Sequence, residues 1–474
     1  MTSCSSATKQ GLPGGPAGIP VLGAALKWKG PETNLEWTKE YGPIYSVRIG
    51  PNQLVYLNTI ELVEEYMEKK GAAFLGRPEG PAAIANGLLF GQGKKWRENR
   101  NAFMRAMWRA SINEPYEAII NNEVDFLVSQ FSDHLGSPLE IDTLLLPALS
   151  SRLVALLLGE PVPRDGEEMA VLLQQMRNLE EVDLTSKSTQ MFLKVKKFRR
   201  PLEAVSGRTI PDMFKMSEAM QGLLRGWISR RRAALAKNGG QPNPNALLDQ
   251  LLTSEEYANK SEEFDKELMQ SVMDLFNGGV TSSLSALEFA FLYLMHHPEV
   301  QAKVKTEIDQ VVAGGHGITW ANREQFPYTQ ATLIEVLRLG SVTPSSLPHV
   351  TTEDVVIDEQ YEIPQDVFVM ASIYSMHRDS RFYKKPELFQ PERHINAEGK
   401  VVRPRSYRPF GVGERLCVGY NLAEIELFLF MARLVSTFRF RAEDPTQPPP
   451  FDTQMRVVRR LLPFACVLEH WQNT

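Results

Sequence analysis

A long, apolar segment with helical periodicity runs from about Phe264 to His297, and it constrains the fold more than any other feature of this sequence. As one helix it would be on the order of 50 Å long, at ~1.5 Å per residue, which is the length of a whole domain. A helix that is both so long and so apolar has to pass through the protein core. Two more helical segments, β-rich pieces around Val350 to Tyr374 and a final helix follow it.

The rest of the chain shows no repeat and no internal linker. A Pro/Gly-rich stretch, "GLPGGPAGIPVLG", cannot form regular helix, so residues 1–23 are predicted to be a stiff N-terminal arm. Two β-rich runs split by Gly-Pro-Asn at 50–52 predict a hairpin, and the chain from about Trp96 to His297 is mostly helical in pattern. We therefore predict one domain over residues 24–474, mainly α with a smaller β-rich part.

Composition excludes several classes of protein. Hydrophobic residues make up 43% and charged residues 23%, which fits a folded globular chain, and a net charge of −5 gives no reason to expect a nucleic-acid partner. Three cysteines, Cys4, Cys417 and Cys466, form neither a disulfide framework nor a zinc motif, so a reducing compartment fits best. The first ten residues lack the apolar core of a signal peptide, and no run approaches the ~20 apolar residues of a membrane span.

One cysteine stands in an unusual setting, the segment "RPFGVGERLCVGYNLAEIELF". A helix beginning near Val418 would place Cys417 at its N-terminus, where free backbone N–H groups and the helix dipole favour a thiolate. Glycines at 411, 413 and 419 let peptide N–H groups approach the sulfur closely. A buried cysteine in a tight turn is the simpler alternative, whereas a dinucleotide-binding loop is excluded because Leu416 stands where GxGxxG needs glycine.

The pattern Phe410-x-x-Gly413-x-Arg415-x-Cys417-x-Gly419 resembles the haem-thiolate signature of the cytochrome P450 family, in particular of its microsomal animal members. The resemblance extends over most of the chain and implies the fold of that family. It also implies that Cys417 is the axial ligand of the iron of haem b. Phe410, Arg415 and Gly419 would then contact the same cofactor.

A second motif of the family braces the fold. "IEVLRL" places Glu335 and Arg338 on one face of a helix, where they can form an ion pair. The family adds an arginine from a downstream "FxPxRF" segment, and "FQPERH" supplies Arg393 here. His394 replaces the final aromatic residue, and we expect this change to affect local packing but not the ion pair. We regard Glu335, Arg338 and Arg393 as structural.

A third group of residues is expected to hold the haem propionates. "GKKWRENR" places Trp96 and Arg100 four residues apart, so that the indole N–H and the guanidinium point the same way. The alternative is a solvated basic face with one packed tryptophan. The family uses such a WxxxR helix for the propionates, and the resemblance adds His349 and Arg415, with Arg77 as a further member.

The centre of the long helix contains the residues that are expected to take part in catalysis. Gly278 and Gly279 stand in mid-helix, at a cost of ~1 kcal/mol each, so close approach of a ligand or of another helix must favour them. The family has a glycine here, followed by an acid and a threonine that deliver protons to dioxygen. This chain has Thr281 and Ser282 instead, so we expect Gly279, Thr281 and Ser282 to line the oxygen groove without an ionisable acid.

These features predict a haem-dependent monooxygenase that inserts one oxygen atom from O2 into an apolar small molecule such as a steroid, a fatty acid or a foreign compound. The missing acid leaves open a haem-thiolate hydroperoxide or endoperoxide isomerase or dehydratase, and a non-catalytic haem sensor is a third alternative. Expected partners are an NADPH-dependent reductase, or else a ferredoxin.

The resemblance further implies a monomer at the endoplasmic-reticulum membrane, although no anchor is present in this sequence. The basic run "KVKKFRRP" at 194–201 is by default a solvated face, and contact with a membrane surface is the alternative. A basic face for the electron donor is expected from five residues, namely Lys94, Lys95, Arg97, Arg403 and Arg405.

Overall fold

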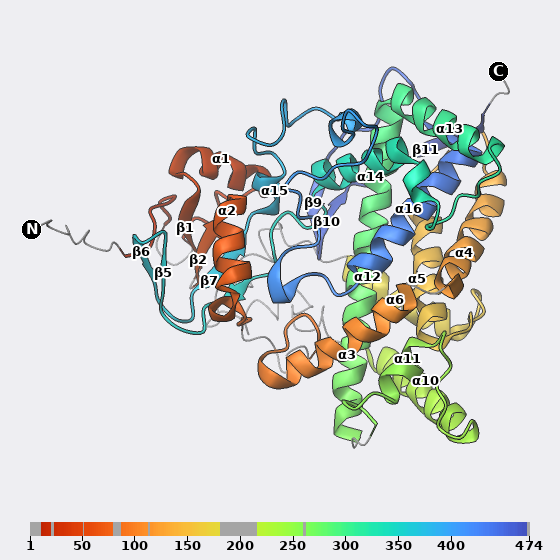
Figure 1. Cartoon of the computed structure of the whole chain (residues 1–474), viewed down its shortest axis with the longest axis horizontal. Coiled ribbons are helices and arrows are strands. Elements are labelled where there is room, and N and C mark those ends of the chain that lie inside the picture. Colours follow the sequence, from red (N-terminus) through yellow and green to blue (C-terminus); the bar gives the residue numbers. More distant parts are fainter. Residues whose placement is uncertain are drawn as a thin grey trace, which may run out of the picture.

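The computed structural model describes residues 11–19, 23–50, 52–78, 87–111, 114–180, 216–258 and 262–471. Cys4 and the basic run at 194–201 lie outside these ranges, so the predictions about them remain predictions. Within the described ranges the protein is mainly helical, with small sheets gathered toward one side (Figure 1). The predicted fold class, mainly α with a smaller β-rich part, is confirmed.

The long helix predicted from the sequence is α12, Glu262–His296, and it runs through the body of the protein (Figure 1). By length and composition alone its span Asp265–His296 could cross a membrane, but 78% of the most apolar window is buried inside the protein. It is therefore the core helix of the fold. Phe276, Leu287 and Phe291 along it are fully buried, and they join the main apolar core.

Several other helices pack against α12, and a smaller group of helices lies beside the sheets on the β-rich side (Figure 1). Pro31, Pro298, Pro327 and Pro391 each stand in the first turn of a helix, where the missing N–H costs no hydrogen bond. The helices, in chain order, are α1 Pro31–Tyr41, α2 Ile60–Val63, η1 Glu64–Lys69, η2 Gly71–Phe74, α3 Gly93–Ser111, α4 Glu114–Ser132, α5 Asp142–Leu158, α6 Glu167–Glu180, α10 Glu218–Lys237, α11 Leu247–Leu252, α12 Glu262–His296, α13 Pro298–Ala313, η4 Arg323–Gln325, α14 Pro327–Gly340, α15 Ile373–Met376, η5 Pro391–His394, η6 Gly413–Arg415 and α16 Tyr420–Thr437.

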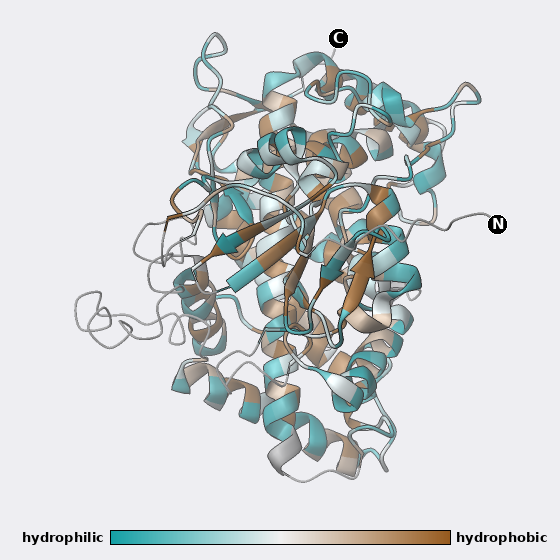
Figure 2. Ribbon diagram, turned by 90° about the vertical axis from the view of Figure 1, so that its left-hand side faces the viewer, coloured by the Kyte–Doolittle hydropathy of each residue, from teal (hydrophilic) through white to brown (hydrophobic). Residues whose placement is uncertain are grey.

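The largest sheet forms the β-rich side, and its apolar strands face the viewer in Figure 2. The predicted hairpin is confirmed, since β1 and β2 pair antiparallel from Ile44 opposite Leu57 to Ile49 opposite Asn52. The sheet order is β1-β2-β7-β4. The strands, in chain order, are β1 Ile44–Ile49, β2 Asn52–Leu57, β3 Pro138–Leu139, β4 His349–Val350, β5 Val355–Ile357, β6 Tyr361–Ile363, β7 Phe368–Ala371, β8 Phe438–Arg441, β9 Thr453–Met455, β10 Arg459–Leu461 and β11 Cys466–His470.

The segment before α16 folds into a loop, residues 408–419, which we call the Cys417 loop. α16 begins at Tyr420, two residues later than predicted, so Cys417 precedes the helix as expected. Gly413 has a φ of +64°, and a Cβ there would lie 2.2 Å from the Met67 carbonyl oxygen. Only glycine fits this position, because both the backbone angle and the close approach exclude a side chain.

Candidate functional site

A cavity of about 300 Å³ lies between the Cys417 loop and the middle of α12. Its wall is mostly apolar, as in small-molecule sites of proteins. Of the residues predicted to contact the cofactor, Trp96 does not line the cavity. The structure brings five others together with Cys417 in its wall, namely Arg100, His349, Phe410, Arg415 and Gly419.

The side chain of Cys417 is exposed, and it opens onto this cavity. Burial raises the pKa of the thiol, and this effect outweighs the Gly419 N–H hydrogen bond and the charge of Arg100, which both lower the pKa. The backbone N–H and the nearby cation thus act in the expected direction, but they do not offset burial. A thiolate at this position needs a further positive charge in the cavity.

Three arginines, Arg77, Arg100 and Arg415, meet at one side of the cavity, and no carboxylate of the described residues forms an ion pair with any of them. Burial, followed by the charges of Arg77 and Arg100, lowers the pKa of Arg415 to about 8. Burial and Arg100 likewise lower the pKa of Arg77 to about 10. Arg415 Nη2 donates to two backbone oxygens, but its Nε and Nη1 are buried without a hydrogen-bond partner among the described residues. This corner of the cavity therefore suits an anionic group.

Trp96 differs from its predicted role. Its Nε1–H donates to the Leu88 carbonyl oxygen at 3.1 Å, so it does not point into the cavity. The indole instead supports the arginines, because the guanidinium carbon of Arg415 lies 3.4 Å from the centroid of the Trp96 ring. Arg100, one turn further along α3, also lies over this ring, 5.9 Å from its centroid. Trp96 therefore packs beneath both arginines, and only the direction of its N–H differs from the expectation.

His349 lines the cavity from β4 as expected. Its Nδ1 lies 2.7 Å from the Phe74 carbonyl oxygen and must carry the proton of that hydrogen bond. Burial, followed by Arg77, lowers the pKa of His349 to about 3, so the ring is neutral and its Nε2 is an acceptor. His349 can donate from Nε2 to a carboxylate only if the ring takes up a second proton. The negative charge of the carboxylate would favour that protonation.

The predicted groove on α12 is present in part. Gly278, Gly279 and Ser282 line the cavity, and the Ser282 hydroxyl donates to the Gly278 carbonyl oxygen at 2.5 Å. Thr281 does not line the cavity, which corrects our expectation for it. Its side chain is fully buried and its hydroxyl donates to the Asn277 carbonyl oxygen at 2.5 Å, because one step of about 100° along the helix turns it away from the face of Ser282.

The predicted brace is formed behind the Cys417 loop. Glu335 and Arg338 of α14 are fully buried and paired, with Arg338 Nε 2.7 Å from Glu335 Oε2. Arg393 Nε adds a contact of 3.0 Å to Oε1. His394 Nε2 lies 2.9 Å from Oε2, so our expectation that His394 would not touch the ion pair is wrong. Burial alone would raise the pKa of Glu335, but hydrogen bonds from Arg338 and His394 lower it to about 2.

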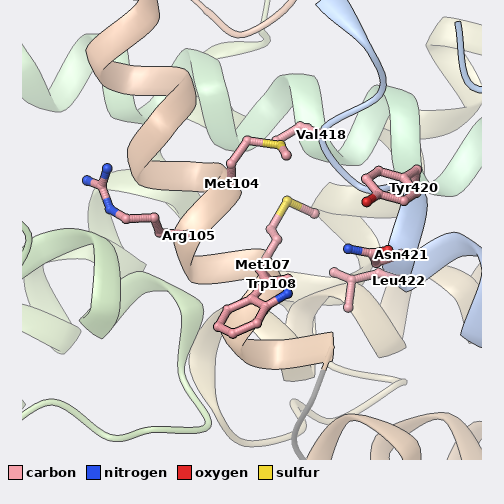
Figure 3. A pocket seen from close by; sticks show the side chains of 8 residues that line it. All are labelled: Met104, Arg105, Met107, Trp108, Val418, Tyr420, Asn421 and Leu422. Atoms are coloured by element: carbon pink, nitrogen blue, oxygen red, sulfur yellow. The ribbon is translucent and has the colours of Figure 1, made fainter. Parts of the chain in front are cut away.

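A second, outer pocket of about 260 Å³ lies beside the same loop, between α3 and the start of α16 (Figure 3). Met104 and Met107 project toward Val418 and Tyr420, and exposed Trp108 borders the opening. Met107, Val418 and Leu422 line both this pocket and the Cys417 cavity. The wall between the Cys417 cavity and the protein surface is therefore thin here.

The predicted basic face nearby is largely neutralised. Arg97 lies 2.9 Å from Glu414, and Arg403 lies 2.8 Å from Glu424. Arg405 pairs with Glu64, and Lys94 lies 3.8 Å from Glu98. Four of the five expected residues thus face a carboxylate, and exposed pairs of this kind contribute little to stability. These residues do not form a run of unpaired cations.

Three charged residues of the cavity wall were not predicted from the sequence, namely Asp274, Arg152 and Glu426. One signal could have pointed to the last two, since Arg152 is the only charged residue of "LLLPALSSRLVALLL" and Glu426 stands in "IELFLF". A charge in an otherwise apolar helix needs a buried partner. The sequence does not say where along the other helices that partner lies.

Comparison with known proteins agrees with this site. The family model described as Cytochrome P450 matches residues 13–466. Cytochrome P450 2F3 of Capra hircus is 28% identical over 92% of this chain and 89% of its own length. Cytochrome P450 1A5 of Gallus gallus is 26% identical over 91% and 84%, respectively. Members of this family bind haem b and use electrons from NADPH through a reductase. The chain therefore belongs to the cytochrome P450 family of haem monooxygenases.

Proposed function

We propose that this protein inserts one oxygen atom from O2 into an apolar small molecule, using electrons that a redox partner takes from NADPH. The observation that carries the proposal is the cavity itself. Cys417 opens into it from one side, and the small residues Gly278, Gly279 and Ser282 border it on another. Arginines that pair with no carboxylate in the described part of the chain form a third side. A flat, dianionic cofactor that needs a thiolate ligand fits these three features.

In the proposed site, Cys417 would hold the haem iron, and a positive charge there would offset the burial that raises the pKa of the thiol. Arg415 would bind a propionate, since its Nε and Nη1 have no hydrogen-bond partner among the described residues. Arg100 and Arg77 lie near Arg415, and the Trp96 ring packs against its guanidinium. His349, Phe410 and Gly419 complete the pocket. Haem supplies the activation of dioxygen and the transfer of one oxygen atom to the substrate.

The substrate is proposed to lie against the apolar wall opposite the arginines. Leu275, Ala286, Val342 and Val458 contribute to this wall. Such a surface positions a substrate by shape and excludes water, but it offers few polar groups that could select one hydroxyl or amine. Steroids, fatty acids and foreign compounds are the proposed classes of substrate. The C–H bond that is oxidised would lie near Gly279 and Ser282.

Electrons are proposed to enter near the outer pocket, where Met107, Val418 and Leu422 separate the surface from Cys417. We propose an NADPH-dependent reductase as donor, with a ferredoxin as the alternative. By resemblance to microsomal relatives, the protein is proposed to act as a monomer at the endoplasmic-reticulum membrane, with the arm 1–23 leading into the catalytic domain 24–474. Part of that arm packs on the sheet, since the Ser46 hydroxyl donates to the Pro13 carbonyl oxygen at 2.6 Å.

A second candidate is a haem-thiolate hydroperoxide or endoperoxide isomerase or dehydratase. One observation favours it: no acid stands at 281, and the hydroxyls of Thr281 and Ser282 both donate to carbonyl oxygens of their own helix. Rearrangement of a peroxide needs neither NADPH nor protons from solvent.

One experiment separates the two candidates. Apolar compounds are first screened for shifts in the haem spectrum, and the compounds that bind are then incubated with NADPH and reductase. Product that depends on NADPH and O2 supports the monooxygenase. Rapid conversion of a lipid hydroperoxide, with no NADPH-dependent product from any bound compound, would instead establish the second candidate.

A further inference from the structure

One asparagine in the cavity wall has a side-chain oxygen without a partner. Asn277 lies on α12, lines the Cys417 cavity and is only 7% exposed. Its Oδ1 is buried and has no hydrogen-bond partner among the described residues. Its backbone carbonyl oxygen, by contrast, accepts a hydrogen bond from the Thr281 hydroxyl. The unsatisfied group is therefore the side-chain amide, at the border of the cavity.

Another buried asparagine shows how this protein satisfies an amide that only supports the fold. Asn99 of α3 donates from Nδ2 to the Ser271 hydroxyl at 2.8 Å, and its Oδ1 accepts from the Tyr257 hydroxyl. A buried acceptor without a donor destabilises the folded state, so a structural asparagine is expected to resemble Asn99. Asparagine is also a weaker helix former than leucine or alanine, so helix stability does not explain Asn277. A ligand in the cavity would explain it.

The other unsatisfied atoms in this wall belong to charged side chains with different surroundings. They are on Arg152, Glu426 and Arg415. Arg152 and Glu426 lie 2.9 Å apart and form an ion pair, whereas Arg415 belongs to the corner that suits an anion. Asn277 is thus the uncharged residue with such an atom in the described part of the wall.

Asp274, one turn before Asn277 on α12, does not compete for the same ligand group. Its two carboxylate oxygens accept hydrogen bonds from the Leu89 backbone N–H at 3.0 Å and from Gln270 Nε2 at 2.9 Å. The acceptor that this part of α12 leaves for a ligand is therefore Asn277 Oδ1.

The position of Asn277 relates the amide to the proposed site of oxidation. Gly279 and Ser282 follow it on α12 by two and five residues, which is about 3 and 7.5 Å along the helix axis at ~1.5 Å per residue. Leu275 and Ala286 add apolar surface to the same wall. A molecule whose polar end binds Asn277 would lay its apolar body along this wall. A C–H bond several bonds away from the polar end would then lie near Gly279 and Ser282.

We propose that Asn277 selects apolar substrates that carry a hydroxyl group, and that this hydroxyl donates a hydrogen bond to Asn277 Oδ1. The proposal rests on the proposed monooxygenase function and narrows its class of substrate. An ether or a hydrocarbon cannot donate, so either would leave the buried oxygen unsatisfied, and this kind of mismatch gives strong discrimination. An ammonium group could donate, but it would bring a charge that the amide does not neutralise.

The first test measures stability without a ligand. Asn277→Leu replaces the unpartnered amide with an apolar side chain of similar size, so the midpoint of urea denaturation should stay the same or rise. Asn99→Leu is the matched control, and its midpoint should fall clearly, because Ser271 and Tyr257 lose their partner. A clear fall in the midpoint of Asn277→Leu would show that the amide supports the fold, which would overturn the proposal.

The second test measures binding to the haem-loaded protein. The probes are borneol and dodecanol, each compared with its methyl ether and its parent hydrocarbon, and binding is followed by equilibrium dialysis and by shifts in the haem spectrum. We expect at least one alcohol to bind about tenfold more tightly than its ether, the scale of one hydrogen bond to a buried group, and Asn277→Leu to abolish this preference. A preference that survives in Asn277→Leu overturns the proposal. A panel in which no alcohol is preferred, including one in which nothing binds, also overturns it.

A second variant separates hydrogen bonding from the shape of the wall. Leu275→Ala enlarges the cavity beside Asn277 but leaves the amide in place. It should weaken the binding of alcohol and ether by similar factors and keep the ratio of their affinities. If Leu275→Ala removes the preference for the alcohol as completely as Asn277→Leu does, the preference arises from shape and the proposal fails.

Turnover then distinguishes this proposal from the function on which it rests. With NADPH and reductase, the preferred alcohol should be oxidised at a carbon several bonds from its hydroxyl, and Asn277→Leu should spread the product over more positions. NADPH-dependent product from compounds that show no alcohol preference would leave the monooxygenase standing and overturn the role of Asn277. An alcohol preference that depends on Asn277, with no NADPH-dependent product from any probe, would support the hydroxyl site and count against the monooxygenase.

Discussion

His394 Nε2 lies 2.9 Å from Glu335 Oε2, the oxygen that Arg338 Nε also reaches at 2.7 Å. Both residues of the His394–Glu335 contact are fully buried. In the family pattern an aromatic residue occupies the position of His394, and it could not donate a hydrogen bond. This chain has therefore added a donor to the buried carboxylate that ties α14 to η5.

The first prediction follows from this contact. His394→Phe restores the aromatic residue but leaves Glu335 with one donor fewer, so the free energy of unfolding should fall by about 1–3 kcal/mol, the cost of leaving a buried acceptor short of a partner. Urea denaturation measures the change. The control is His316→Phe on an exposed loop, which should be nearly neutral. A His394→Phe protein as stable as the native one would show that the contact is energetically unimportant.

The second prediction concerns acid stability. The ordinary pKa of a glutamate is 4.5, and hydrogen bonds from Arg338 and His394 outweigh burial and lower that of Glu335 to about 2. Because the folded-state pKa is the lower one, the ionised carboxylate stabilises the fold fully above pH 4.5, and this contribution is lost as the pH falls toward 2. The difference corresponds to about 3 kcal/mol.

Glu335→Gln should therefore be less stable than the native protein at pH 7 and should lose less further stability between pH 4.5 and pH 2. Urea midpoints across this range measure the effect. Glu443→Gln at an exposed position is the control and should follow the native curve. A Glu335→Gln protein with the same acid sensitivity as the native protein would contradict the lowered pKa.

The third prediction tests the axial ligand. Cys417→Ser should abolish the thiolate-type absorption spectrum of the reduced carbon monoxide complex, because a serine hydroxyl does not replace the soft anionic sulfur. Cys466→Ser in β11 serves as the control, and the spectrum of any haem-loaded protein it yields should be unchanged. An unaltered spectrum in Cys417→Ser would refute the assignment of Cys417.

The fourth prediction separates cofactor binding from folding at Arg415. Arg415→Met removes a cation whose Nε and Nη1 have no hydrogen-bond partner among the described residues and whose neighbours Arg77 and Arg100 repel it. Relief of this repulsion offsets the loss of the two backbone hydrogen bonds of Nη2, so the haem-free protein should change little in stability. Haem affinity should fall by about tenfold or more, the value of one lost charge-assisted contact. Arg97→Met, which removes an exposed partner of Glu414, is the control. Unchanged haem affinity would exclude Arg415 from the propionate site.

Local patterns were sufficient to predict the main elements of this fold. The apolar period of α12, the Gly-Pro-Asn break between β1 and β2, and the glycines before Cys417 each act through neighbouring residues. Their predicted positions agree with the structure to within a few residues. The family signature then added the brace between Glu335 and Arg338, which brings η5 onto α14.

The remaining features depend on which side of a helix meets which neighbour, and spacing along one chain segment does not determine this. Trp96 and Arg100 are four residues apart, yet the indole donates to Leu88 and not toward the cavity. Thr281 and Ser282 are adjacent, yet only Ser282 faces the cavity. The contact between Arg152 and Glu426 joins helices far apart in the sequence, so the two charges were visible but their pairing was not.

The last prediction uses the different positions of Thr281 and Ser282. Ser282 lines the cavity, so in a monooxygenase Ser282→Ala should divert reducing equivalents into peroxide and lower the product formed per NADPH consumed. Thr281→Val is the matched control, because Thr281 is buried on another face and its loss should leave coupling unchanged. Thr281→Asp would bury a carboxylate with no cation in contact with it, so we now expect it to destabilise the protein by several kcal/mol and not to improve coupling.

If the protein instead rearranges a peroxide, Ser282→Ala and Thr281→Val should both turn over a hydroperoxide at nearly the native rate, because no proton has to be delivered from solvent. Product per NADPH, peroxide release and hydroperoxide turnover are measured side by side in the native protein and both variants. Equal coupling in Ser282→Ala and Thr281→Val, in a protein that does consume NADPH for product, would remove Ser282 from the proton path. The serine would then be a small residue that only makes room on α12.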